Sequence, residues 1–185
     1  QITKEENTIS LKTDRSTAKG IIQVFERDIK NVITSDSSYS ISLKDIKLEV
    51  DETTTLTLAH TFIFPEYNAV LEQQELELSA KNPQRQLQKR IEEKTRQLST
   101  LNNNLDTNWR DITYKDLVAK TVLTLQNNTR IPAGELKHAG IFPSYHYKWF
   151  LGFWAWDSWK HAVAVSHYNT VLAKSQIKAM YDFQL

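Results

Sequence analysis

The sequence predicts an α+β protein, with strands in the first third of the chain and helices in the rest. Apolar and polar residues alternate over 56–64, which is the two-residue period of a half-buried strand. From residue 66 onward Glu, Gln, Lys, Arg and Leu predominate, and these residues favour helix. The chain has 185 residues, enough for one domain or for parts of two.

In the strand region, residues 39–50 and 56–64 are expected to pair as an antiparallel hairpin with one buried face. The first run alternates up to Leu43 and then changes phase, as a bulge or kink would require. Pro65 ends the second run because proline cannot donate to a strand ladder. The apolar side chains in these runs are Tyr39, Ile41, Leu43, Ile46, Leu48, Val50, Leu56, Leu58, Phe62 and Phe64, and an earlier apolar patch holds Ile21, Ile22, Val24 and Phe25.

The helical segment 66–105 is expected to break at Asn82, which would cap a second helix starting at Pro83. Beyond the break lies a narrow apolar stripe made of Leu87, Ile91, Leu98, Leu101 and Leu105. Such a stripe is typical of a solvated amphipathic helix on a domain surface. A coiled-coil partner helix is the alternative, although Lys94 interrupts the seam.

Further helices are expected in the last third of the chain. Thr113 would cap one that begins at Tyr114, with an apolar face formed by Tyr114, Leu117, Val118, Val122 and Leu125. The stretch 129–147 contains two prolines and two glycines and is expected to be loop. Two more helices should run from Trp159 to about His167 and from Thr170 to Gln184. The second would turn Leu172, Ala173, Ile177, Met180 and Tyr181 inward.

Composition excludes several classes of function. The net charge is +1 with dispersed lysines and arginines, which argues against a nucleic-acid partner. There is no cysteine, so thiolate chemistry and cysteine-bound metals are excluded. Four histidines, at 138, 146, 161 and 167, show no metal-ligand spacing, and no cofactor is expected. No run of 18 apolar residues occurs, so no membrane partner is expected either.

The densest aromatic cluster is the candidate functional site. Four of the five tryptophans fall between 149 and 159, and one carboxylate, Asp157, lies among them. Sugar rings have apolar faces and a rim of hydroxyls, so a sugar site needs flat aromatic surfaces and a few fixed polar acceptors. An ionised carboxylate accepts strong hydrogen bonds from hydroxyls. The alternative is a tryptophan-rich core in which Asp157 caps the following helix.

Residues 115–184 resemble glycoside hydrolase family 63, in its bacterial α-glucosidase branch. The segments that carry the resemblance are 123–130 (LTLQNNTR), 132–134 (PAG), 142–144 (FPS), 148–150 (KWF), 154–162 (WAWDSWKHA), 167–169 (HYN), 172–174 (LAK) and 177–179 (IKA). The tryptophan–aspartate–serine core is also similar to the signature of the related trehalases.

The resemblance implies a three-part architecture. Family chains carry an N-terminal antiparallel β-sandwich, a helical linker and a C-terminal (α/α)6 barrel. On that layout the end of the β-sandwich lies in 1–66, the helical linker in 67–111, and the first helices of the (α/α)6 barrel in 112–185. The resemblance is specific for the last of these parts and less specific for the other two.

The family hydrolyses α-glucosidic bonds with inversion, which needs an acid and a base carboxyl group roughly 6.5–9.5 Å apart. The resemblance implies that Asp157 binds the sugar and that the acid and base lie in later motifs. This chain alone is therefore expected to be inactive.

Glu135 and Asp182 are the nearby carboxylates, and no family motif supports either as the acid. The substrate-binding residues implied are Asp157, Trp154, Trp156, Phe150, Lys160 and Trp149, with Trp149 and Trp159 alternatively structural.

The expected partners are an oligosaccharide substrate and the remainder of the same protein. The first helices of a barrel cannot bury their inner faces alone, and apolar surface worth roughly 25 cal/mol per Å² would stay wet. Two other functions remain open: a non-catalytic carbohydrate-binding or structural module, and a trehalase-like hydrolase. The bacterial branch implies a periplasmic or secreted protein whose leader has been removed, and a cytoplasmic location is the alternative.

Overall fold

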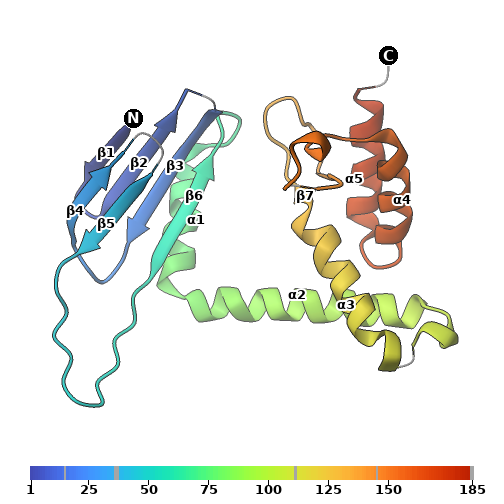
Figure 1. The fold of residues 1–185 in the computed structure, drawn as a ribbon, viewed down its shortest axis with the longest axis horizontal. Coiled ribbons are helices and arrows are strands. Elements are labelled where there is room, and N and C mark those ends of the chain that lie inside the picture. Colours follow the sequence, from blue (N-terminus) through green and yellow to red (C-terminus); the bar gives the residue numbers. More distant parts are fainter. Residues whose placement is uncertain (15, 36–37, 111, 145, 184–185) are drawn as a thin grey trace. The chain divides into compact units, whose positions relative to one another are not determined.

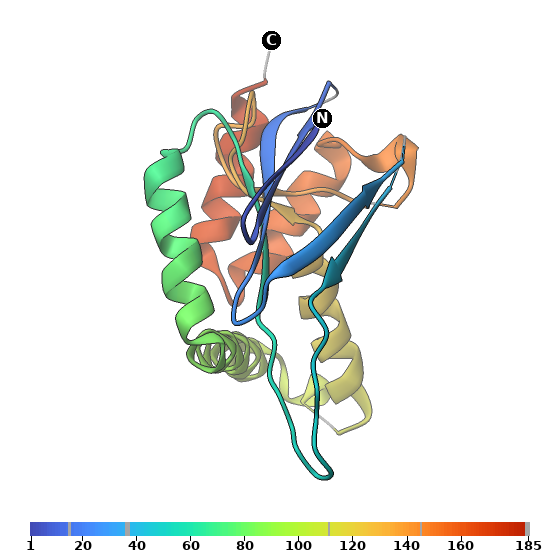
Figure 2. The same cartoon turned by 90° about the vertical axis from the view of Figure 1, so that its left-hand side faces the viewer.

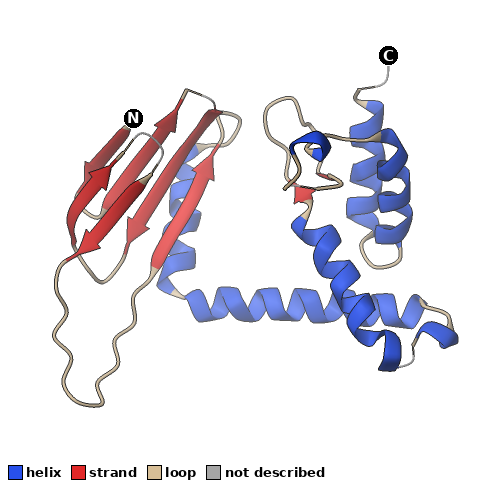
Figure 3. Cartoon of the chain, in the orientation of Figure 1, coloured by secondary structure: helices blue, strands red, loops and turns tan. Residues whose placement is uncertain are grey.

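The computed structural model describes residues 1–14, 16–35, 38–110, 112–144 and 146–183. Over these residues the protein is α+β, as the sequence predicts, with antiparallel sheets and five α-helices (Figures 1 and 3). The chain forms two compact units, Gln1–Leu87 and Gln88–Leu185. Among the helices described, none is both long and apolar enough to cross a membrane.

The first unit contains two antiparallel sheets. A four-stranded sheet has the order β1-β2-β3-β6, and a two-stranded sheet pairs β4 with β5. The strands are β1 (Ile2–Glu5), β2 (Thr8–Thr13), β3 (Ser16–Val24), β4 (Ile29–Thr34), β5 (Tyr39–Leu43) and β6 (Leu58–Ile63). Figure 2 shows the long connection 44–57 extending beyond the strand ends.

One apolar core joins these two sheets. Ile9 and Ile22 are directly opposite each other in the β2–β3 ladder, so their side chains lie on the same face. They cluster with Val24 and with Ile29 of β4, and all four are buried. Partly buried side chains from both sheets complete the cluster: Ile2, Leu11, Val32, Ile41 and Leu43. The two sheets therefore share one hydrophobic core.

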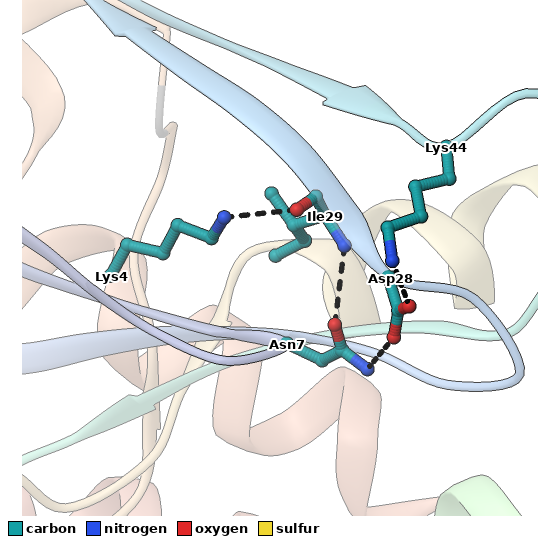
Figure 4. A network of polar contacts seen from close by, with 5 residues as sticks. All are labelled: Lys4, Asn7, Asp28, Ile29 and Lys44. Atoms are coloured by element: carbon teal, nitrogen blue, oxygen red, sulfur yellow. Dashed lines mark hydrogen bonds and ion pairs between the residues drawn. The ribbon is translucent and has the colours of Figure 1, made fainter.

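A polar network ties the β1–β2 turn to the start of β4 (Figure 4). The Asn7 side chain accepts from the backbone nitrogen of Ile29 at 3.1 Å and donates to Asp28 at 3.3 Å. Lys4 donates to the Ile29 carbonyl at 2.9 Å, and Lys44 donates to Asp28 at 2.7 Å. The hydrogen bond from Lys44, followed by that from Asn7, lowers the pKa of Asp28 below its usual value.

Helix α1 (Ala69–Lys81) packs on the opposite face of the four-stranded sheet. Asn68 begins it by accepting from the backbone nitrogens of Val70 and Leu71. Gln73 of this helix donates to Gln23 of β3 at 3.0 Å. Gln23 alternates with the core residues of β3, so the sheet is covered on both faces.

The predicted hairpin between 39–50 and 56–64 is wrong. β5 pairs with β4, and β6 pairs with β3. Residues 44–50, after the phase change, form no strand, and Ile46, Leu48 and Val50 are exposed. The burial predicted for 56–64 is also wrong, because Leu58 and Phe62 are exposed while Ile63 is buried. β6 is an edge strand of its sheet, so its outer side chains lack a neighbour on one side.

The predicted helix break is confirmed. Helix α2 (Pro83–Asn104) starts at the proline, and the Asn82 side chain accepts from the backbone nitrogen of Arg85 at 3.0 Å. The apolar stripe on α2 is exposed at Leu87 and Ile91 and buried at Leu101. Farther along, Asn104 donates to the carbonyl of His167 at 2.6 Å, which ties α2 to the end of α4.

The second unit is mainly helical. After the short 3-10 helix η1 (Thr107–Trp109), its elements are α3 (Ile112–Asn127), β7 (Thr129–Arg130), β8 (Gly140–Ile141), the 3-10 helix η2 (Lys148–Phe150), α4 (Ala155–Ser166) and α5 (Thr170–Tyr181). Figure 1 shows α4 and α5 as an antiparallel pair. Their cluster holds Ile141, Val165 and Ala173, with Leu125, Leu172 and Tyr168 packed against it.

Five predictions in this unit need correction. On α3, Tyr114 and Leu117 of the expected apolar face are exposed, whereas Val122 is buried. α3 begins before Thr113, which is therefore inside the helix and does not cap it. The 129–147 stretch contains the β7–β8 pair as well as loop. α4 begins four residues earlier than predicted, at Ala155. α5 buries Ala173, Gln176 and Ala179, whereas Ile177 and Tyr181 are exposed, and Gln184 lies outside the described residues.

Replacing Asn7 with alanine should destabilise the protein by about 1–2 kcal/mol, because two hydrogen bonds are lost and the Ile29 amide is left unpaired. Urea unfolding followed by circular dichroism measures the change. Asn31→Ala is the matched control, since Asn31 is exposed on β4. Equal stability of the two variants would contradict a role for Asn7 in joining the sheets.

Candidate functional site

The aromatic motif, residues 148–160, spans η2 and the first two turns of α4. Phe150 ends η2, and its ring lies 5.2 Å from that of Trp154, the N-cap residue of α4. Two lysines cover tryptophan faces: Lys148 Nζ lies 4.7 Å from the centre of the Trp149 ring, and Lys160 Nζ lies 4.4 Å from that of Trp156. The structure thus gathers the predicted site residues at one helix start.

The tryptophans of this motif are not core residues. Trp149 is 72% exposed and Trp156 is 74% exposed, and Trp154 and Trp159 are each nearly half exposed. Trp159 contacts Tyr181 of α5 edge-to-face, with 6.2 Å between ring centres. An exposed aromatic group of this size is unusual for a purely structural cluster. Within the described residues, these four tryptophans therefore do not form a buried core.

Asp157 lies in the first turn of α4 and is partly buried. Trp154 occupies the N-cap position, so Asp157 is not the cap that the alternative interpretation required. Over the described residues, Asp157 makes no hydrogen bond or ion pair, and Lys160 contacts Trp156 instead. A carboxylate in a first helical turn is favoured by the helix dipole. Its oxygens remain available as acceptors for a bound group.

A buried amide holds the preceding loop against α5. The Gln176 side chain accepts from the backbone nitrogen of Ile141 and donates to the Ile141 carbonyl at 3.4 Å. Both residues are completely buried. Beside them, Gly140 packs directly against the Phe153 ring, and any side chain at Gly140 would overlap that ring. These contacts fix where the chain enters the aromatic motif.

The buried face of α4 carries polar groups as well as apolar ones. Ser158 is completely buried, and its hydroxyl has no hydrogen-bond partner among the described residues. Nδ1 of His161 likewise has none. Burial lowers the pKa of His161, and this outweighs the opposing effects of the Asp157 charge and of the hydrogen bond with the Ile141 backbone. The lowered pKa favours the neutral imidazole.

An apolar cavity of about 570 Å³ opens beside the motif. Phe142, Phe153 and Phe183 line it together with Met180 and Leu136, and Glu135 is the only ionisable residue among the described residues that line it. Sequence patterns did not predict this cavity, because its walls come from a loop, the segment before α4 and the end of α5. The glycine-flanked position of Glu135 was the one available signal.

Asp182, the other carboxylate considered, is paired. Its side chain lies 2.6 Å from Nδ1 of His138, which joins the end of α5 to the loop that carries Glu135. Both side chains are partly buried. Asp182 therefore has a structural role, in which it connects the end of α5 to this loop, and that role needs no substrate.

The site combines exposed aromatic faces with one carboxylate. Among the described residues, no group of three His, Cys, Asp or Glu side chains could hold a metal ion. A scan against protein-family models found no match to this chain.

Gly140→Ala should destabilise the protein by about 1–3 kcal/mol, because the added methyl group displaces the Phe153 ring. Gly152→Ala is the control, since a methyl group there meets no neighbouring atom within 4 Å. Thermal unfolding monitored by circular dichroism compares the two variants. A Gly140→Ala variant as stable as Gly152→Ala would refute the close packing.

Stability should fall as the pH drops below about 6.5, the usual pKa of an unfolded histidine. The unfolded chain then binds a proton that folded His161, with its lowered pKa, does not bind. The melting temperature from pH 5 to 8 measures the effect, and His161→Gln should have a shallower acid dependence than the parent. Identical pH profiles of the two proteins would overturn the assignment.

Proposed function

We propose that this chain is part of an inverting α-glucosidase of glycoside hydrolase family 63 and supplies the sugar-binding subsite. On this proposal the two packed sheets are the end of a β-sandwich, the segment 67–111 is the linker, and the segment 112–185 starts an (α/α)6 barrel. The observation that carries the proposal is a tryptophan surface left exposed around an unpaired carboxylate.

Each residue has a distinct role in this proposal. Asp157 accepts hydrogen bonds from sugar hydroxyls, and its negative charge strengthens them. Trp156 and Trp154 present apolar faces against the C–H surface of the ring, and Phe150 packs on Trp154. Lys160 lies over Trp156 and can turn its ammonium group to a hydroxyl. Trp149 extends the aromatic surface, and its exposure makes a purely packing role unfavourable.

The hydrolytic step itself needs two carboxyl groups with opposite protonation roles. Asp157 alone cannot be both acid and base. The proposed role is therefore to hold and orient the sugar, with the acid and base supplied by other parts of the whole protein.

A non-catalytic carbohydrate-binding module is the second candidate. The same exposed aromatic surface favours it, because stacking and hydroxyl binding do not require hydrolysis. Both candidates are expected to bind sugars, but only the glycosidase would hydrolyse them. A trehalase-like hydrolase would share the site and would differ in preferring trehalose.

Asp157→Asn should weaken glucoside binding by about 10- to 150-fold, since a charge-assisted hydrogen bond is worth about 1.5–3 kcal/mol. Trp156→Ala should weaken it by a similar factor through lost stacking. Titration of the protein with maltose, kojibiose, nigerose and trehalose, followed by tryptophan fluorescence or calorimetry, measures both effects.

Trp109→Ala is the control for Trp156→Ala, because Trp109 is also an exposed tryptophan but lies in η1, outside the motif. Undiminished binding by Asp157→Asn would refute its role. Hydrolysis of the same disaccharides, measured for the longer protein with and without Asp157→Asn, separates the two candidates. Activity that depends on Asp157 supports the glycosidase, and binding without turnover supports the binding module.

A further inference from the structure

The apolar cavity beside the motif combines aromatic walls with a single negative charge. Phe142 and Phe153 meet edge-to-face, with 4.8 Å between their ring centres, and Phe183 lines the cavity with them. Met180 and Leu136 provide further apolar wall, and Glu135 supplies the carboxylate. The volume of the cavity, about 570 Å³, lies within the range of small-molecule sites.

A tight turn holds Glu135 in place. Ala133 and Leu136 exchange two backbone hydrogen bonds, from Ala133 N at 3.0 Å and from Leu136 N at 3.1 Å. Gly134 provides the positive φ of 56° that this turn requires. In the described part of the chain no cation pairs with Glu135. The turn therefore fixes the backbone at Glu135, whose exposed carboxylate has no ion-pair partner among the described residues, while Arg130 lies over the Phe142 ring with 5.4 Å from its guanidinium carbon to the ring centre.

The opposite wall is anchored to the same loop. Asp182, which precedes Phe183, contacts His138 of the loop at 2.6 Å. This contact links the end of α5 to the segment that carries Glu135. These contacts join the two chain segments that carry Phe183 and Glu135, whose side chains are themselves exposed.

From this arrangement we propose that the cavity binds an organic ammonium ion with an aromatic body. Aromatic faces attract cations through their quadrupoles, and a carboxylate supplies the opposite charge. The apolar walls exclude a strongly hydrated metal ion and favour a ligand that buries a hydrocarbon body. This site is distinct from the tryptophan surface: Phe153 and Ala155 line the cavity, whereas Trp154 and Trp156 are exposed.

Phenethylammonium and 2-phenylethanol are the matched probes, because they differ in the charge of one terminal group. Calorimetry or ligand-observed NMR with the purified protein should show at least fivefold tighter binding of phenethylammonium. Glu135→Gln should remove that preference and leave the affinity for 2-phenylethanol unchanged. Asp116→Asn, which neutralises an exposed carboxylate on α3, should change neither affinity.

Gly152→Leu should block both probes, because Gly152 lines the cavity and has open space beside it. A circular dichroism spectrum confirms that each variant is folded before titration. Equal affinity of the two probes, or an unchanged preference in Glu135→Gln, would overturn the proposal. Binding that persists in folded Gly152→Leu would place the ligand elsewhere and overturn it as well. None of these outcomes depends on the glucoside titrations.

Discussion

The buried amide of Gln176 is the interaction on which the candidate site depends. It meets both the backbone nitrogen and the carbonyl of Ile141, so the loop before the aromatic motif is tied to α5. Burying a polar side chain is unfavourable unless its hydrogen bonds are made. Here both ends of the amide are used by one backbone position. These two hydrogen bonds hold the loop at Ile141. The preceding residue, Gly140, has no room for a side chain that could hold the loop by apolar packing.

After this loop, successive residues of the segment 153–156 belong to two different surfaces. Phe153 and Ala155 line the apolar cavity, whereas Trp154 and Trp156 are exposed beside Asp157. Trp154 has an extended backbone, with φ −105° and ψ 117°, which turns successive side chains to opposite sides just before the helix begins. The exposed tryptophan surface and the apolar cavity can therefore be neighbours without sharing side chains.

The first unit is held together by an apolar core that its two sheets share. A polar network between the β1–β2 turn and the start of β4 adds to this. Ile9, Ile22, Val24 and Ile29 supply the apolar contact. Asn7 adds directional contacts that specify which backbone position of β4 meets the β1–β2 turn. Apolar burial is non-directional, so hydrogen bonds of this kind define the register between the elements.

Local patterns predicted the elements better than their pairing. Composition was enough to predict the α2 start, because Asn82 and Pro83 act on their own backbone neighbours. The strand partners were wrong because alternation identifies a two-sided strand and carries no information on which strand lies beside it. The start of α4 was placed too late because Ala155 and Trp156 are helical without a capping side chain.

The amino-acid order alone shows what the candidate site is made of: a run of tryptophans around one carboxylate, with no cysteine and nearly balanced charge. It does not show which of these side chains are exposed or where the apolar cavity with Glu135 forms, and the folded chain is needed for both. Exposure and cavities depend on what packs beside a residue. Those neighbours come from α5 and from a loop that are distant along the chain.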